Sequence, residues 1–187
     1  PQARVSMGAP IETLAWGRVG TPGLLLLHGN SAHADWYSFI GPLLAAGRRV
    51  VAMSFSGMGG SGWRTQYGVA QWADEALAVA EATGLFSAPV PPVVAGHSFG
   101  GFPLLNLASR HPGFYDAVAS YSGYPTVTMP GFTQGIQASV AEMGGNPSNM
   151  WGTYPLGQWA ANDPFLTAGN LAGKHVYVSS GTGVGSR

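Results

Sequence analysis

Short, continuously apolar runs alternate along this chain with longer segments whose apolar residues recur at helical spacing. The runs lie at residues 24–27, 49–55, 92–96, 117–121 and 175–180, and a further strand is predicted at residues 11–19. Apolar runs without a polar face are typical of parallel strands that are covered on both sides. We therefore expect a parallel sheet that is buried between helices.

Helices are predicted between these strands, at residues 35–46, 72–83, 102–110 and 133–143. The first carries five apolar residues at helical spacing: Trp36, Phe39, Ile40, Leu43 and Leu44. In the second, Glu75 falls off the apolar face together with the other acids. This alternation predicts one α/β domain over residues 1–187, a doubly wound, mostly parallel sheet with a lid-like irregular segment at residues 123–172.

Composition narrows the classes of partner. Eight basic residues balance eight acidic ones, and charged residues make up only 9% of the chain, so no basic surface for nucleic acid or for a membrane is expected. The chain has no cysteine, which excludes disulfides and thiolate metal sites, and no His, Asp or Glu spacing predicts a metal site. We expect no membrane span and no cofactor.

The sequence Gly96-His97-Ser98-Phe99-Gly100 lies between a predicted strand and a predicted helix, as in a nucleophile elbow. The sharp turn places Ser98 in a strained conformation at the tip of the sheet, and small residues at Gly96 and Gly100 let strand and helix pass each other. The backbone N–H of Phe99 and that of Asn30, in the loop after the first apolar run, are the expected oxyanion donors. A chance Gly-x-Ser-x-Gly turn is the alternative, and the order of strand, elbow, helix and upstream loop argues against it.

Three segments in this order, LLLLHGNSAHADW, VVAMSFSGMGGSGW and VVAGHSFGGF, resemble the α/β-hydrolase superfamily of esterases, lipases and peptidase-like hydrolases over residues 11–123. An acidic residue that often stands at Ser54 or Ser56 in that superfamily, where it shapes a turn, is absent. The resemblance implies catalysis by Ser98 through an acyl-enzyme, on a small-molecule or lipid ester.

The C-terminal part, residues 111–183, resembles the mycolyltransferases, secreted serine acyltransferases that move long acyl chains onto trehalose. The resemblance rests on GGNPSNMWG, on Asn162-Asp163-Pro164 and on HVYVSSGTG. It implies a secreted or cell-envelope location. The elbow GHSFGG departs from the GxSMxG form of that family, which suggests the hypothesis of a chimeric or recombined chain.

The catalytic base is not evident from the sequence. His175 begins a strand whose other end faces the site, roughly 16 Å away, and His111 ends the helix that starts at the elbow, nearly 18 Å away by its rise of about 1.5 Å per residue. His28 is expected to brace its loop by a hydrogen bond, and His97 to project elsewhere. His33 remains open as a substitute base.

In both resembling families the acid follows the strand that matches residues 176–180, and the histidine comes later. Residues 181–187 contain neither, so we expect the C-terminal strand and helix of the full fold to be missing. Because a nucleophile without its base loses about six orders of magnitude in rate, we predict weak or no turnover. A non-catalytic engineered or chimeric α/β module is the alternative. An open sheet edge also predicts self-association.

Two further patterns have competing interpretations. Gly57-x-Gly59-x-x-Gly62 matches a dinucleotide fingerprint, but the next strand does not end in the required acid, so an ordinary loop is favoured. Trp36 and Trp151 are candidates for an acyl pocket. The aromatic residues of the irregular segment, Trp151, Tyr154, Trp159 and Phe165, fit an apolar acyl wall and plain packing about equally well.

Overall fold

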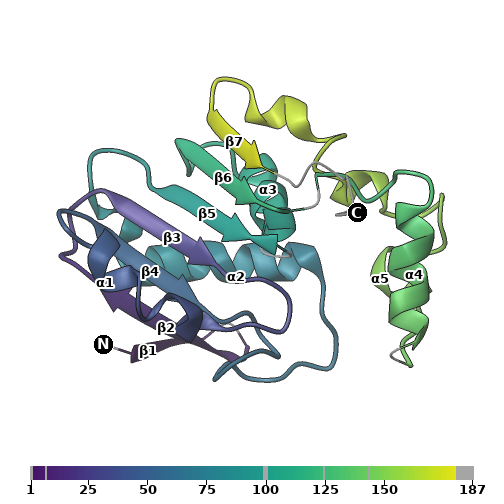
Figure 1. The fold of residues 1–187 in the computed structure, drawn as a ribbon, viewed down its shortest axis with the longest axis horizontal. Coiled ribbons are helices and arrows are strands. Elements are labelled where there is room, and N and C mark those ends of the chain that lie inside the picture. The colour runs from purple at the N-terminus through teal and green to yellow at the C-terminus, as the bar shows by residue number, and fades with distance from the viewer. Residues whose placement is uncertain (1, 7, 99–100, 124, 143, 180–187) are drawn as a thin grey trace, which may run out of the picture.

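The computed structural model of the chain describes residues 2–6, 8–98, 101–123, 125–142 and 144–179. Its strands form one seven-stranded sheet in the order β1-β2-β4-β3-β5-β6-β7 (Figure 1). Their bounds are β1 Gln2–Ser6, β2 Pro10–Trp16, β3 Gly23–Leu27, β4 Arg49–Met53, β5 Val93–His97, β6 Ala117–Tyr121 and β7 His175–Ser179.

The sheet is mostly parallel, as the sequence predicts. Strands β4, β3, β5, β6 and β7 run parallel to one another, and β2 and β1 add an antiparallel edge. The strand β1 was not expected. Chain order reverses at β3, because β4 lies on one side of it and β5 on the other. Crevices at such reversals, beyond the carboxyl ends of the strands, are where open α/β sheets bind ligands.

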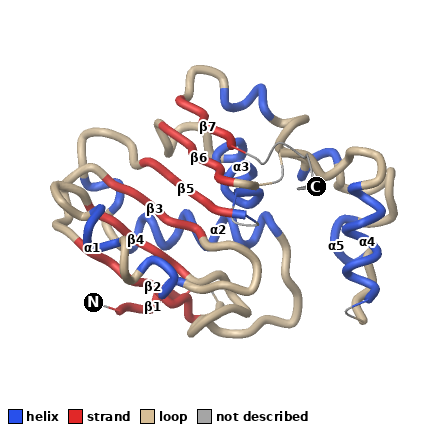
Figure 2. The backbone as a smooth tube through the Cα atoms, viewed as in Figure 1, coloured by secondary structure: helices blue, strands red, loops and turns tan. Residues whose placement is uncertain are grey.

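Helices cover both faces of the sheet (Figure 2). The α-helices are α1 Gly41–Leu44, α2 Val69–Ala82, α3 Gly101–Arg110, α4 Phe132–Glu142 and α5 Ser148–Trp151. The short 3-10 helices are η1 Ala34–Tyr37, η2 Leu85–Ser87, η4 Ala160–Asn162 and η5 Ala168–Leu171. On one face, the buried residues Leu25 and Val51 pack in a cluster with Val79 of α2 and Leu104 of α3. On the other, Leu24 and Val50 cluster with Ala34 of η1.

The helix predicted at residues 35–46 is wrong, because the structure divides this segment into η1 and α1. Pro42 cannot donate a hydrogen bond to the preceding turn, and its ring would clash there, so a continuous helix cannot pass through it. Gly41 lies against Trp16, and a Cβ at Gly41 would be only 2.5 Å from that ring. The predicted apolar face is not buried: the exposed fraction is 64% for Trp36 and 86% for Phe39.

Helix α2 confirms its prediction, except for Glu75. That residue is fully buried on the packed face, where its carboxylate accepts hydrogen bonds from Arg64 Nε at 2.9 Å and from Ser56 N–H at 3.0 Å. Glu75 therefore anchors the loop after β4 to the helix, a role that periodicity alone does not reveal.

The irregular segment carries α4 and α5, which stand apart from the sheet beside the ends toward which the parallel strands point (Figure 1). Trp151 and Trp159 of this segment cluster with Phe102 of α3 and Val69 of α2. Of the helix α4, only Thr133 is buried. Among the described residues, no helix is both long and apolar enough to cross a bilayer.

Candidate active site

Ser98 follows β5 directly and has a φ of 54°, in the left-handed region that residues other than glycine rarely occupy. Strand β5 ends at His97, and the residue after it must turn the chain sharply toward α3, which begins at Gly101. A positive φ at a serine between strand and helix is the backbone feature of a nucleophile elbow. Ser98 as a whole residue is half-buried.

The side chain of Ser98 faces the loop after β3. A Cβ built on Gly29 would lie 3.3 Å from Ser98 Cβ and 3.7 Å from its Oγ. The sheet register explains this proximity, because Leu27 of β3 pairs with Gly96 of β5 and the two chains leave the sheet side by side. The hydroxyl and the loop that carries Asn30 thus meet where the strand order reverses.

The two expected oxyanion donors differ in what the structure describes. Asn30 lies exposed in the loop beside Ser98 and lines a large groove, whereas Phe99 and Gly100 lie outside the described residues.

Gly101 is a further small residue of the elbow that sequence reasoning missed. A Cβ there would be 2.3 Å from Ser120 Oγ and 2.8 Å from the Cα of Gly123. The last glycine of the GHSFGG sequence was the available signal.

His28 braces its loop, as the sequence predicts. Its Nδ1 lies 2.7 Å from the carbonyl oxygen of Gly29, to which it donates, and its Nε2 accepts the backbone N–H of Phe55 at 3.1 Å. Burial lowers the pKa of His28, so the ring is neutral with the proton on Nδ1. Because both nitrogens are engaged, His28 is not available to take a proton from Ser98.

The remaining histidines lie in different surroundings. His33 is half-exposed, with Nδ1 3.7 Å from Asp35 Oδ2. His97 is exposed at the end of β5. His111 lies at the end of α3 with Nε2 3.7 Å from Asp74 Oδ1, and His175 begins β7 in register with Ala117, at the opposite end of the sheet from Ser98. Among the described residues, no imidazole is hydrogen-bonded to Ser98.

A buried glutamate from a neighbouring strand contacts Ser54, one of the two positions where the superfamily often has a turn-shaping acid. Glu12 of β2 accepts hydrogen bonds from Ser54 Oγ at 2.7 Å and from Gly60 N–H at 2.8 Å. Ser54 Oγ in turn accepts the N–H of Ala34 at 2.9 Å. Glu12 thus connects the loop after β4 with the segment after β3, and it supplies from β2 the carboxylate that the loop itself lacks.

The same carboxylate supports the interpretation of the Gly57-x-Gly59-x-x-Gly62 sequence as a loop. Cβ atoms at Gly59 and Gly60 would lie 2.8 and 2.5 Å from the Glu12 carboxylate, and a Cβ at Gly57 would contact the ring of Tyr67 at 2.8 Å. The glycines are needed for close packing against side chains. A carboxylate within the turn would repel a phosphate.

A groove of about 860 Å³ opens beside Asn30. The wall of the groove on the side of the sheet, called its body side, is formed by Val69 and Trp72 of α2 and Phe102 of α3. The opposite, outer wall is formed by Phe132, Ile136 and other residues of α4 and α5. Trp151 lines it, as an acyl-pocket residue would, and also packs edge-on against Trp159 at a centroid distance of 4.9 Å. The size lies within the range of small-molecule sites in proteins.

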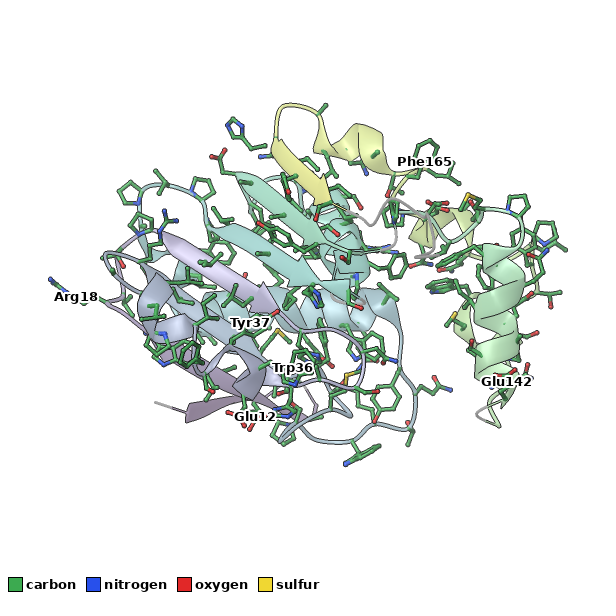
Figure 3. All side chains as sticks on the ribbon, in the orientation of Figure 1. Glu12, Arg18, Trp36, Tyr37, Glu142 and Phe165 are labelled. Carbon is green, nitrogen blue, oxygen red and sulfur yellow. The ribbon has the colours of Figure 1, made fainter. Side chains whose placement is uncertain are left out.

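Trp36 is placed elsewhere. It lies exposed on η1, in front of the sheet, next to Tyr37, whose hydroxyl donates to the carbonyl of Leu27 at 2.8 Å (Figure 3). Within the described part of the chain, the residues that line the groove do not include Trp36. No group of three or more His, Asp or Glu side chains among the described residues is placed to hold a metal ion.

Asp163 is a fully buried carboxylate in the irregular segment. Its Oδ2 accepts hydrogen bonds from both hydroxyls and two backbone N–H groups of residues 126–128, at 2.6–2.9 Å. Burial by itself would raise the pKa of Asp163, but the bonds from Thr128, Thr126 and the two amides outweigh it and lower the pKa below its ordinary value. The carboxylate therefore organises the turn that carries Val127, a groove residue.

Comparison with known proteins shows which families this chain resembles. A family model described as "Putative esterase" matches residues 54–185. The MPT51 antigen of Mycobacterium leprae is 34% identical over 92 residues, which are 49% of this chain and 31% of that protein. The 2-hydroxymuconate semialdehyde hydrolase of Pseudomonas sp. is 37% identical over 95 residues, 48% of this chain and 32% of that protein.

Solved structures agree on the fold. Epoxide hydrolase A from Mycobacterium thermoresistibile superposes with a TM-score of 0.63 at 24% identity, over 75% of this chain and 44% of that one. The chain thus spans about a third of the length of these curated relatives and less than half of this structural neighbour. The α/β-hydrolase resemblance predicted from the motifs is confirmed, and so is the mycolyltransferase-like resemblance, through the MPT51 antigen. The hypothesis of a chimeric chain stays a prediction.

Proposed function

The chain belongs to the esterase family of α/β-hydrolases, and we propose that it is a serine-dependent carboxylic-ester hydrolase or acyltransferase acting through Ser98. The observation that carries this proposal is the positive φ of Ser98 at the end of β5, with its hydroxyl turned toward the Asn30 loop. The groove beside Asn30 supplies a place for the acyl part of the ester. We propose that the whole chain acts as one domain, with residues 123–172 as a lid over the site.

In the proposed reaction, Ser98 Oγ attacks the ester carbonyl and loses its proton to a base. The carbonyl oxygen becomes an oxyanion, which the backbone N–H groups of Asn30 and Phe99 stabilise. Collapse of this intermediate forms the acyl-enzyme, and the alcohol leaves with the proton. Water or a second hydroxyl compound then attacks the acyl carbon, which releases the acid or the new ester and restores Ser98.

His33 is the proposed substitute base, because it follows the loop next to Ser98 and carries an acidic neighbour, Asp35, on the same short segment. The hydroxyl of Ser98 has no hydrogen bond to any histidine among the described residues, so the rate of proton removal is expected to be low. We propose weak turnover for this chain: the oxyanion donors supply on the order of a thousandfold over the uncatalysed reaction, and His33 adds to this.

A fluorophosphonate probe tests the nucleophile directly, because it modifies an activated serine and leaves an ordinary one unmodified. We expect one label on the wild-type chain, at Ser98, and none on Ser98→Ala. Ser122 is the matched control, since it also has a φ of 54° directly after a parallel strand and is exposed. Retention of the label in Ser98→Ala, or its loss in Ser122→Ala, would disprove the assignment.

Hydrolysis of p-nitrophenyl esters tests the base. We expect His33→Ala to lower the Ser98-dependent rate at least tenfold and His97→Ala to leave it within twofold. The alternative function, a non-catalytic α/β module, predicts a rate that neither Ser98→Ala nor His33→Ala changes. The two proposals therefore differ in the Ser98→Ala and His33→Ala arms of the assay, and His97→Ala is the control in both.

A second copy of the chain is the proposed partner at the edge of the sheet. Strand β7 is the last strand of the described sheet, and its residues Val176, Tyr177 and Val178 are all about half exposed. Such edges pair with other strands unless charges or proline prevent it. Light scattering after size exclusion should show a dimer, and Val178→Lys should give a monomer. A wild-type monomer at high micromolar concentration would contradict this proposal.

A further inference from the structure

The groove beside the proposed nucleophile has a polar rim and an apolar interior. Asn30, Gln66, Asn146 and Asn149 are exposed at its margin, and each is polar and uncharged. Val69, Trp72 and Phe102 form the interior on the body side, where Val69 and Phe102 are buried. Among the residues that the structure describes, no side chain that lines the groove carries a charge.

The outer wall is built by one face of α4. Phe132, Ile136 and Val140 recur at a spacing of four residues, so they lie above one another on the side of the helix that faces the groove. Ala138 of the same helix is exposed and is not among the lining residues. Glu142, the last residue of α4, lies at the end of the helix that points away from the sheet (Figure 3).

Two charged side chains that adjoin groove residues are satisfied by other groups. Arg64, which precedes the groove residues Thr65 and Gln66, pairs with the buried Glu75 at 2.9 Å. Asp163 accepts the N–H of Val127, and its charge is enclosed by the hydrogen-bond donors of residues 126–128. Neither side chain lines the groove, so neither presents its charge to a ligand there.

From this arrangement we infer that the groove binds substrates whose acyl part is neutral and apolar, and that it excludes acyl parts bearing a carboxylate. An ionised carboxylate that enters the groove loses its hydration and gains no cationic partner, which is costly. An alkyl chain gains by burial, and an uncharged polar end can bond to the amides of the rim. This inference rests on the proposed function and names the substrate class of the same site.

Binding to Ser98→Ala tests the inference without requiring turnover. Octanamide and the monoamide of octanedioic acid carry the same amide at the carbonyl end and have the same chain length, but at pH 7.5 only the monoamide has a carboxylate, at the far end of its acyl chain. Quenching of the groove tryptophans or calorimetry gives their affinities. We expect octanamide to bind at least about tenfold more tightly. Equal binding, tighter binding of the monoamide, or no binding of octanamide would overturn the inference.

Ile136→Lys adds the cation that the groove lacks, and Ala138→Lys adds the same charge to the outer face of the same helix. We expect Ile136→Lys to tighten binding of the monoamide at least about tenfold and to weaken binding of octanamide, and Ala138→Lys to change neither beyond twofold. If both variants tighten binding of the monoamide equally, the groove is not the binding site. Fluorophosphonate labelling of the wild-type chain remains a separate readout, so failure of the nucleophile and failure of the groove are distinguishable.

Discussion

Gly29 faces Ser98 across the point where the strand order reverses, and a side chain at position 29 would press against the serine. A Cβ at Gly29 would lie 3.3 Å from both Ser98 Cβ and the carbonyl oxygen of His97. These distances are shorter than about nine in ten Cβ contacts in proteins. The glycine of the loop after β3 thus sets the position of the proposed nucleophile relative to the proposed oxyanion donor Asn30.

Gly29→Ala should therefore damage the site more than the fold. The added methyl group pushes the serine by a few tenths of an ångström, and misplacement of reacting groups by about 1 Å can cost a hundredfold in rate. We expect labelling of Ser98 by a fluorophosphonate to slow about tenfold. Gly113→Ala, where a Cβ would meet open space, should leave the labelling rate unchanged. An unaltered rate in Gly29→Ala would show that the contact does not position the hydroxyl.

Strand positions and the elbow followed from the sequence because each depends on local signals. The five apolar runs coincide with β3 to β7 within two residues at each end, since such runs are stable only between two layers of helices. Ser98 was placed by the glycines around it and by the strand before it. The irregular segment was identified, but its helix α5 and the groove it helps to form depend on contacts far apart in sequence.

Residues that act across the fold were missed for the same reason. Glu12 and Glu75 are charged residues in or beside apolar periodicities, and nothing in their neighbourhoods indicates burial. Each is buried because partners from a distant loop, Gly60 for the first and Arg64 for the second, satisfy its carboxylate. The prediction of one helix over residues 35–46 failed for a different reason. It followed the helical spacing of the apolar residues and overlooked Pro42, which interrupts the helix.

Glu75→Gln should destabilise the chain strongly. The change leaves Arg64 without the carboxylate that it contacts at 2.9 Å, and breaking a buried ion pair costs about 3–5 kcal/mol. Asp74, the preceding residue on α2, has an exposed side chain and is the matched control. We expect Asp74→Asn to change the free energy of unfolding by no more than about 0.5 kcal/mol. Urea denaturation measures both, and equal losses would argue against a special role for the buried pair.

His28 should make stability depend on pH in the range below neutrality. Burial lowers its pKa in the folded chain, whereas the unfolded chain titrates at about 6.5, so the unfolded state binds more protons as the pH falls below that value. The contribution of His28 is therefore fully present above about pH 6.5 and is lost progressively toward its folded pKa. His28→Gln should reduce the fall in unfolding free energy between pH 7 and pH 5.

The control for this pH effect is His175→Gln, since His175 is exposed at the start of β7. It should keep the slope of the wild-type chain. His28→Gln should also lower stability at pH 7 by about 1–3 kcal/mol, because the hydrogen bonds to Phe55 and Gly29 are weakened or lost. A slope that is identical in wild type and His28→Gln would contradict the assignment.

Asp163→Asn should loosen the segment that carries α4 and α5. Hydroxyl and amide donors surround Asp163 Oδ2, so replacing one carboxylate oxygen by an NH₂ group sets donors against donors. A loss of about 2–4 kcal/mol is expected, whereas Thr126→Val, which removes a single bond to the same oxygen, should cost about 1 kcal/mol. Asp116→Asn, at an exposed aspartate, serves as the control for the change of charge.

Hydrogen exchange locates the effect of Asp163→Asn. The amides of Val127 and Thr128 donate to Asp163, and Val127 lines the groove, so their faster exchange should accompany weaker binding of octanamide. Because hydrogen bonds keep the pKa of Asp163 low, the wild-type chain should retain this protection down to about pH 4 and lose it only as the pH falls further. Protected amides in Asp163→Asn at neutral pH would mean that the aromatic cluster around Trp151 and Trp159, and not the carboxylate, holds the groove in place.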